Sequence, residues 1–274
     1  MSSTLWRATW AGEHTVVLKI SHNRDRGQRE LDFLRMQPPS ADTPRLLGAV
    51  EEAARVLLLI EDLGDAVAGD ILTGLSADQA LASVALLGRV HAQHWGRPPT
   101  GWTDAAPRWK DCTDLDISQF IERYPHPWAQ ARLPRLAEAV AAQRPVLAAI
   151  PRTLQHADAH LDNWMFRPEP VLIDWETARY GPAIVDLVRF LMEGVHTHQR
   201  RACQPELLAR WRESVPDVSA ETLDAWLRAG VWYSLNAMLP HYASIDLDAL
   251  SPRLRQVHNH CAMQGLELAA DLVG

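Results

Sequence analysis

The stretch His156-Ala-Asp-Ala-His-Leu-Asp-Asn163 decides how this chain is interpreted, together with Ile173-Asp174-Trp175 shortly after it. It places the Asp158 carboxylate before the Asn163 amide, and a second carboxylate, Asp174, ends a short apolar run. Phosphoryl transfer requires such a set, because one acid orients or deprotonates the nucleophile while an amide and another acid hold Mg²⁺. The sequence therefore predicts a catalytic loop here.

Two other interpretations fit the same residues. His156, Asp158 and His160 alternate, so on an extended strand they would share a face, as the ligands of a hydrolytic Zn²⁺ do. The same groups could also satisfy a buried turn without any chemistry. No partner histidine motif follows downstream, whereas Asp174 lies at the end of an apolar strand, where it could hold a metal-bound triphosphate. The catalytic loop is the favoured interpretation.

The composition is that of a globular protein with a sizeable core. The chain has 274 residues, of which 47% are hydrophobic and 22% charged. No apolar run approaches the ~20 residues of a membrane helix, and the start lacks a signal peptide, so we expect a cytoplasmic protein without a membrane partner. Three widely spaced cysteines predict free thiols in a reducing compartment. The net charge of −7 argues against a nucleic-acid partner, and the oligomeric state stays open.

Local patterns divide the chain into a small β-rich part and a large helical part. In the first part we expect strands at 5–10, 15–20, 45–50 and 55–60, a turn at 11–14 and a helix at 26–36. In the second part we expect helices at 76–95, 117–123, 133–150, 205–214, 220–239 and 252–272, and short strands at 153–155, 164–166 and 171–173. The change in character predicts domains at 1–63 and 64–274.

Lysine is almost absent, since only Lys19 and Lys110 occur among the 27 basic residues. An ammonium and a guanidinium are not interchangeable in a tight site, so both positions are candidates for function. Lys19 lies on an expected strand, and Glu30 lies on the helix that follows. In kinases a strand lysine binds the phosphates of ATP and forms an ion pair with a helix glutamate. The alternative is an edge-strand lysine with a surface glutamate, and Lys110 is expected to be a surface residue.

These motifs resemble the aminoglycoside phosphotransferase/choline kinase-like family, relatives of protein kinases, whose catalytic loop usually reads His-Gly-Asp-x-His-x-x-Asn. Similar elements are Gly181-Pro-Ala-Ile-Val-Asp186-Leu, Ile60-Glu-Asp-Leu63 and Leu87-Gly-Arg-Val-His91. The resemblance spans almost the whole chain. It implies an α+β, two-lobed, protein-kinase-like fold, and a phosphotransferase that uses ATP (or GTP) with Mg²⁺ to modify a hydroxyl of a small molecule.

The resemblance also implies a role for each matching residue. Asp158 would be the catalytic base, and Asn163 and Asp174 would bind Mg²⁺. Lys19 would contact phosphates and pair with Glu30. The remaining matches concern the base and the scaffold: the main chain of Glu61 and Leu63 would hydrogen-bond the purine, Asp186 would brace the catalytic loop, and His91 would be a buried structural residue.

Two departures from the family pattern stand out. Ala157 replaces the usual glycine, and alanine adopts positive φ only at a cost. Only four residues precede the strand at 5–10, so either the chain begins earlier than this sequence, or the first strand and the phosphate-covering loop of the family are missing. This departure motivates an alternative: a nucleotide-binding but catalytically impaired protein with a sensing or scaffold role.

The acceptor stays undetermined at this stage. The family phosphorylates aminoglycosides, macrolides, choline, amino acids and sugars, and recognises them with its helical part. Several tryptophans could form an aromatic box for a quaternary amine, although core packing is the stronger interpretation: Trp102, Trp109, Trp128, Trp226 and Trp232. A set of acidic residues would suit a cationic acceptor, and the alternative is an ordinary solvated cluster: Asp111, Asp114, Asp116 and Glu193.

Overall fold

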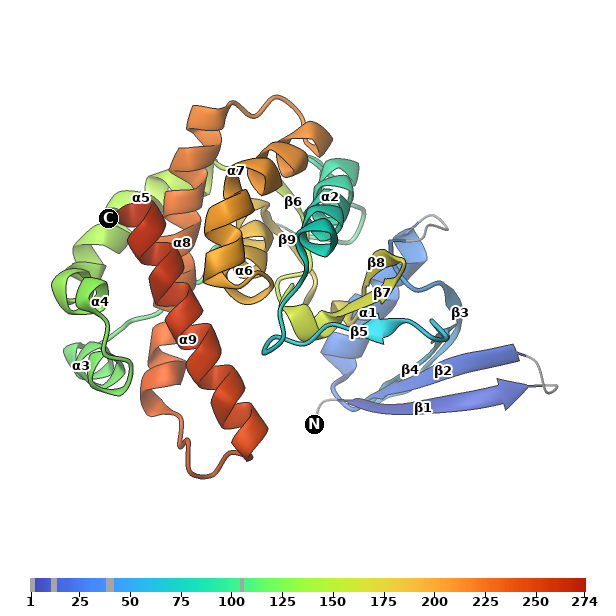
Figure 1. Ribbon diagram of the computed structural model, residues 1–274. Helices are drawn as coiled ribbons and strands as arrows, with labels where there is room; N and C mark the ends of the chain where they lie inside the picture. Colours follow the sequence, from blue (N-terminus) through green and yellow to red (C-terminus); the bar gives the residue numbers. More distant parts are fainter. Residues whose placement is uncertain (1–2, 11–13, 38–41, 104–105) are drawn as a thin grey trace. The chain divides into compact units, whose positions relative to one another are not determined.

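The structure, a computed structural model, describes residues 3–10, 14–37, 42–103 and 106–274 (Figure 1). Its contacts group the chain into two compact units. The first consists of Met1–Gly69 and His156–Arg179, and the second of Asp70–Gln155 and Tyr180–Gly274. The chain therefore leaves the first unit, returns to it for the predicted catalytic loop, and leaves it again.

The first unit contains a four-stranded antiparallel sheet with one helix packed on it (Figure 1). The strands are β1 (Ser3–Trp10), β2 (His14–Ser21), β3 (Leu46–Glu51) and β4 (Val56–Glu61), in the order β1-β2-β4-β3. Helix α1 (Arg24–Met36) begins where the Asn23 side chain accepts the Arg26 N–H. These elements confirm the predicted strands and helix, and residues 11–13 of the predicted turn lie outside the described residues.

A second, three-stranded sheet completes the first unit. It has the order β5-β7-β8, with β5 (Val67–Ala68), β7 (Trp164–Arg167) and β8 (Glu169–Leu172). Strand β5 was not predicted, because two residues show no period. Its pairing with β7 ties the segment after 156 to the amino-terminal residues. The predicted domains at 1–63 and 64–274 stay a prediction. The compact units group residues by their contacts, and each unit contains two separate stretches of the chain.

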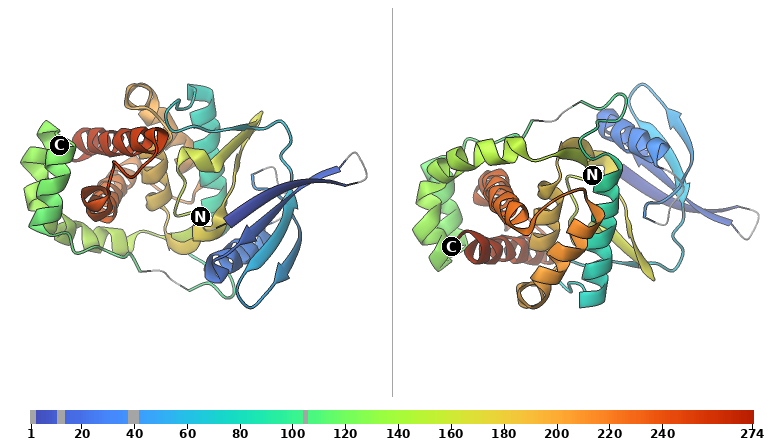
Figure 2. Two further views of the ribbon diagram at one scale, coloured as in Figure 1. Left: turned by 90° about the horizontal axis from the view of Figure 1, so that it is seen from below. Right: turned by 90° about the horizontal axis from the view of Figure 1, so that it is seen from above.

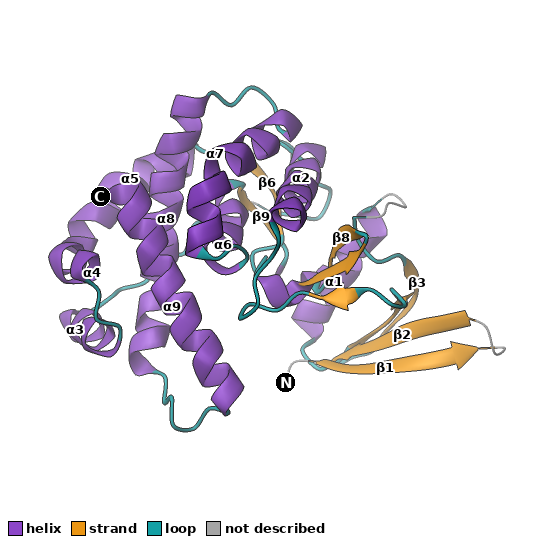
Figure 3. Cartoon of the chain, in the orientation of Figure 1, coloured by secondary structure: helices purple, strands orange, loops and turns teal. Residues whose placement is uncertain are grey.

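The second unit is helical (Figure 3). Its helices are α2 (Ala77–Gln93), α3 (Asp114–Arg123), α4 (Pro127–Arg132), the 3₁₀ turn η1 (Leu133–Arg135), α5 (Leu136–Ala149), α6 (Ile184–Glu193), α7 (Thr197–Ser214), α8 (Ala220–Ser244) and α9 (Pro252–Val273). Strands β6 (Arg152–Gln155) and β9 (Arg179–Pro182) pair with each other. Helix α8 packs against α3, α5, α6 and α9, and Figure 2 shows α8 and α9 side by side. No described helix is long and apolar enough to span a membrane.

Two predicted helix boundaries that were set at prolines are wrong. Helix α7 begins at Thr197 and contains Pro205, and α8 continues through Pro240 to Ser244. Pro240 has no N–H to donate to the Asn236 carbonyl one turn earlier. The Cys112 thiol donates to that carbonyl instead, with Sγ 3.4 Å from the oxygen. Burial, with help from nearby aspartates, raises the pKa of Cys112 to about 11, so the thiol keeps its proton.

Two helices were missed for different reasons. Helix α6 carries its charged residues Asp186, Arg189 and Glu193 at helical spacing among apolar residues, so its helical period was present in the sequence and could have been predicted. Helix α4 has only six residues and begins at Pro127, after His126 caps it by accepting the Trp128 N–H. Helix α4 is therefore too short to show a helical period in the sequence.

The tryptophans named above largely pack on one another and on tyrosine. The rings of Trp128 and Trp232, both 8% exposed, lie 5.6 Å apart, and Trp109 meets Tyr233 edge-to-face at 5.1 Å. These contacts favour core packing for these side chains over an open aromatic box.

His91 is the centre of a buried polar cluster in the second unit. Its ring is fully buried, its Nδ1 accepts the Trp211 indole N–H at 3.1 Å, and its Nε2 lies 3.3 Å from an Asp186 oxygen. Since an indole only donates, Nε2 must carry the ring proton and donate to Asp186. The Thr153 hydroxyl donates to the His91 carbonyl at 2.5 Å. His91 is thus buried and structural, as predicted, whereas the bracing role of Asp186 stays a prediction.

Trp211→Phe should lower the free energy of unfolding by about 1–3 kcal/mol, because it leaves the buried Nδ1 of His91 without a donor. Urea titration followed by circular dichroism measures the change. Trp95→Phe is the matched control, since Trp95 contacts Trp211 in the same aromatic cluster, and within the described part of the chain only its main chain forms a hydrogen bond. Equal losses for the two variants would contradict the role of the hydrogen bond.

Candidate active site

The loop after β6 is organised by His156. Its Nε2 lies 2.8 Å from the Ile173 carbonyl, and its Nδ1 lies 3.3 Å from the main-chain nitrogen of Asp158. A carbonyl only accepts and an N–H only donates, so this imidazole is neutral, with its proton on Nε2. Both ring nitrogens are therefore engaged within the protein, which argues against a metal site built from His156, Asp158 and His160. Among the described residues, no group of three histidine, cysteine or acidic side chains is placed to hold a metal ion.

Asn163 fixes the turn that presents Asp158. It ends the 3₁₀ turn η2 (Leu161–Asn163), and its Nδ2 donates to the Asp158 carbonyl at 2.9 Å. Its main chain pairs with His160 on one side and Ile173 on the other. The Asp158 carboxylate is partly exposed, and its Oδ2 lies 3.4 Å from His160 Nε2. The loop thus holds an acid at the surface by means of a buried amide.

The backbone explains why a glycine would suit position 157. Ala157 has φ of +65°, in the left-handed region where a Cβ meets the neighbouring carbonyl. The sequence departure at this position therefore falls on a strained residue. The strain is tolerated because the hydrogen bonds of His156 and Asn163 fix the loop on both sides.

Ala157→Gly should raise the free energy of unfolding by about 0.5–1 kcal/mol, because relief of the left-handed strain exceeds the added freedom of the unfolded chain. Ala159→Gly serves as the control. This nearby alanine is fully buried and has no positive φ, so losing its methyl group should destabilise the protein. Denaturant unfolding of both variants should give changes of opposite sign, and changes of the same sign would refute the strain argument.

Trp175 connects helix α1 to the catalytic loop. It opens the 3₁₀ turn η3 (Trp175–Thr177), and its ring stacks on Phe33 of α1 at 3.6 Å and meets His156 edge-on at 4.6 Å. Its indole N–H donates to the Leu172 carbonyl. The preceding residue, Asp174, has φ of +63°, which aspartate tolerates better than most residues. The buried ring therefore sets where the Asp174 side chain begins.

Lys19 joins the two predicted acidic partners. Its Nζ lies 2.6 Å from a Glu30 oxygen and 2.5 Å from Asp174 Oδ1. The lysine and glutamate side chains are 5% and 3% exposed, whereas that of Asp174 is 38% exposed. Burial alone would lower the pKa of Lys19, but the two carboxylates outweigh it and raise that pKa above its usual value. The ammonium is charged throughout the neutral range, and the predicted Lys19–Glu30 pairing is present.

Lys19→Met should cost about 3–5 kcal/mol of unfolding free energy at pH 8, because Glu30 is left buried without its cation. Burial raises the pKa of Glu30. In this variant the Glu30 carboxyl therefore binds a proton in the folded state as the pH falls from 8 toward 5, and the buried charge is removed. The loss should therefore be smaller at pH 5 and grow as the pH rises. Urea titrations at both pH values test this expectation.

The double variant Lys19→Met, Glu30→Gln is the control for that pH dependence. It removes the buried carboxyl, so its stability relative to the native chain should change much less between pH 5 and 8. A single variant whose deficit is independent of pH would show that Glu30 is not the group left unpaired.

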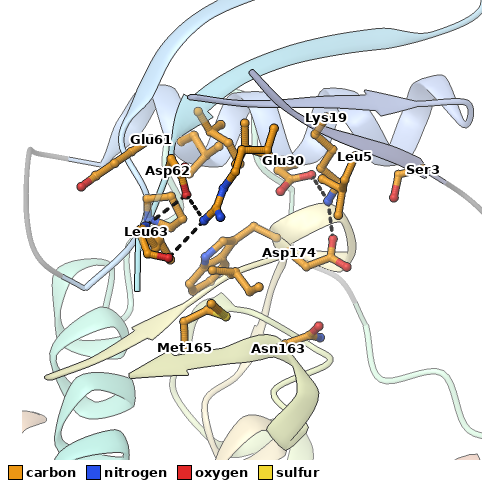
Figure 4. A pocket seen from close by; sticks show the side chains of 18 of the residues that line it. Ser3, Leu5, Lys19, Glu30, Glu61, Asp62, Leu63, Asn163, Met165 and Asp174 are labelled. Atoms are coloured by element: carbon orange, nitrogen blue, oxygen red, sulfur yellow. Dashed lines mark hydrogen bonds and ion pairs between the residues drawn. The ribbon is translucent and has the colours of Figure 1, made fainter. Parts of the chain in front are cut away.

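Lys19, Glu30 and Asp174 line one end of a pocket formed entirely within the first unit (Figure 4). The pocket has a volume of about 370 Å³, in the range of small-molecule sites. Lys19, Glu30, Asp174 and Asn163 gather at one end in Figure 4, and the segment 61–63 lies at the other. Apolar side chains line the space between these ends: Val17, Ile60, Met165 and Ile173.

The segment 61–64 forms the far end of the pocket. The Glu61 carboxylate binds Arg167 at 3.0 Å and Arg45 at 3.4 Å, and the Glu61 N–H donates to the Arg45 carbonyl. Burial would raise the pKa of Glu61, but these donors lower it below its usual value. The side chain and N–H of Glu61 are thus used within the protein, and only its carbonyl could meet a purine. The hydrogen bonds of Glu61 and Leu63 to a base stay predictions.

Sequence reasoning missed several residues that shape the site. Trp175 stands beside Asp174, and Phe33 lies one turn after Glu30, but no local pattern shows that their rings stack. Met165 and Arg7 also line the pocket. Arg7 could have been found from strand alternation, since Leu5 and Arg7 share a face of β1.

With this geometry in place, the comparison with known proteins is informative. The model of the phosphotransferase enzyme family matches residues 2–240. The chain belongs to this family. The match covers most of the chain and includes every residue predicted for the site, and it confirms the family resemblance of the sequence motifs. No curated protein sequence matches the chain.

Solved structures of this family are similar in fold. Choline kinase LicA from Streptococcus pneumoniae is 16% identical, with a TM-score of 0.56 over 96% of this chain and 89% of that chain. Aminoglycoside 2′-phosphotransferase-IIIa, solved with GDP, is 14% identical, with a TM-score of 0.54 over 97% and 88%. APH(2″)-IIa, in a ternary complex with streptomycin and ATP, is 14% identical, with a TM-score of 0.50 over 93% of each chain. These likenesses confirm the predicted kinase-like α+β fold.

Proposed function

We propose that this chain is a small-molecule kinase, which transfers the terminal phosphoryl group of ATP (or GTP) to a hydroxyl of an acceptor such as an antibiotic, an amino alcohol or a sugar. The observation that carries the proposal is the contact of Lys19 with both Glu30 and Asp174 at one end of a nucleotide-sized pocket. Family membership supports the same reaction class.

The pocket has a division of chemistry that suits a nucleoside triphosphate. The charged end offers an ammonium, which attracts phosphates, and the apolar middle offers the flat surfaces that a base requires. The far end is formed by residues 61–64 and Arg7, with the Glu61 carbonyl as an acceptor. A nucleotide would therefore lie with its phosphates at Lys19 and its base toward residues 61–63.

Asp158 is the proposed base. A partly exposed carboxylate, held by a fixed turn, can accept a hydrogen bond from an acceptor hydroxyl and take its proton as the oxygen attacks phosphorus. Lys19 would stabilise the charge on the phosphate oxygens during transfer. The fixed turn matters because the rate depends on holding the attacking oxygen in line with the leaving group.

The donor set at the charged end fits Mg²⁺. Asp174 offers a carboxylate that is 38% exposed, and Asn163 uses its amide nitrogen internally, which leaves the amide oxygen as its ligand. Mg²⁺ favours oxygen ligands and is commonly held by one or two protein side chains plus phosphates and water. When bound, the ion would offset the charge of the phosphates.

Asp158→Asn should lower kcat by about 10²- to 10⁴-fold, with little change in the KM for the nucleotide, because only the proton acceptor is lost. The measurement is nucleotide consumption, with product mass, across a panel of aminoglycosides, macrolides, choline, amino acids and sugars. ATP and GTP are compared as donors.

Asp224→Asn is the control for that variant. It removes an exposed carboxylate from a surface ion pair on α8 and should leave turnover unchanged. Full turnover by Asp158→Asn would reject Asp158 as the base. A native chain that binds nucleotide but modifies no acceptor would instead favour the catalytically impaired alternative.

A further inference from the structure

Arg7 reaches the base end of the nucleotide pocket. In the β1–β2 register, Leu5 lies opposite Lys19 and Arg7 lies opposite Val17, so the side chains of Leu5 and Arg7 project to the same face. Both line the pocket. A step of two residues along a strand is about 6.6 Å, so Arg7 lies well beyond Lys19 in the direction of the segment 61–64.

The guanidinium of Arg7 is held at that end by two acceptors. Its Nη2 lies 2.7 Å from Asp62 Oδ1 and 3.0 Å from the Gly64 carbonyl. The same Asp62 oxygen accepts the Gly64 N–H at 3.0 Å. The Asp62 side chain is only 3% exposed, whereas that of Arg7 is 60% exposed. A buried carboxylate just after β4 thus anchors an exposed cation on β1, and Figure 4 shows Asp62 beside Leu63 at this end.

The chemistry of this anchored group suits a base better than a phosphate. A guanidinium is planar and stacks on aromatic rings, which an ammonium does not do. The groups that it binds, Asp62 and Gly64, draw it away from the charged end where Lys19 lies. The apolar side chains of Val17, Ile60 and Met165 line the same space and could contact the rest of a flat ring.

We propose that Arg7 is a nucleoside-binding residue: anchored by Asp62 and Gly64, its guanidinium covers the base of the bound nucleotide from the β1 side. The proposal rests on the proposed function, since it assumes that the pocket holds a nucleotide. In this proposal Arg7 contacts the base of the nucleotide and not its phosphates, and strand β1 is part of the binding site. Asp62 acts through Arg7 and is a positioning residue.

The test compares the binding of adenosine, ADP and ATP by isothermal titration calorimetry. Arg7→Ala should weaken all three by a similar factor of about 3- to 30-fold, since the lost contact involves only the base. Arg7→Lys keeps the positive charge but lacks the planar guanidinium, so it should bind the three ligands almost as weakly as Arg7→Ala does. Arg35→Ala, which removes an arginine from a surface pair with Glu51 in the same unit, should bind all three like the native chain.

A double-mutant cycle tests the role of Asp62. Asp62→Asn should weaken binding in the native chain but have almost no further effect in the Arg7→Ala background, because it acts through the arginine. Thermal unfolding midpoints close to that of the native chain would show that these variants fold. Additive losses would overturn the positioning role.

Each outcome bears on the proposal. If the native chain binds none of the three ligands, both the proposed function and the role of Arg7 fail. If the native chain binds them and Arg7→Ala binds them equally well, only the role of Arg7 fails. If the loss grows with the number of phosphates, Arg7 is a phosphate ligand, and the base contact is rejected.

Discussion

The ammonium of Lys19 between two carboxylates is the interaction on which the first unit depends. It joins the middle of a sheet to helix α1 through Glu30 and to the loop after β8 through Asp174. It also explains why one of the two lysines of an arginine-rich chain occupies position 19. A compact ammonium can approach two carboxylate oxygens at once from inside a sheet. The larger planar guanidinium of an arginine would need more space and a different approach to the carboxylates.

The proposed catalytic loop and the segment after β8 are fixed by several contacts around two left-handed residues. Ala157 and Asp174 both have positive φ, and the neutral ring of His156 lies between the segments that contain them. Trp175 adds the packing of α1 to the same frame. Strain of this kind persists only where the surroundings fix it, and here it fixes the positions of the proposed base, Asp158, and the proposed metal ligand, Asp174.

The sequence revealed what is local and missed what is not. The helix starts at Ser76, Ser219 and Ser251 follow from caps, and the strands around Lys19 follow from alternation and apolar runs. The continuation of α8 through Pro240 could not be predicted, because the missing donor is replaced by a thiol that is remote in sequence. The proposed catalytic loop was recognisable because its groups are close in sequence. The contacts of Phe33 with Trp175 and of Arg7 with Asp62 join residues that are far apart in sequence.

The discontinuity of the first unit has a consequence for how the protein is made. Lys19 and Asp174 are 155 residues apart, so the amino-terminal sheet leaves the ribosome long before its ionic partner and the strands that complete its unit. Helices α2 to α5 are synthesised in the interval. Until then Lys19 has only Glu30 as an ionic partner, and β5 has no β7 to pair with. Chain topology thus makes the proposed nucleotide pocket a late product of translation, although the pocket begins with the first strand.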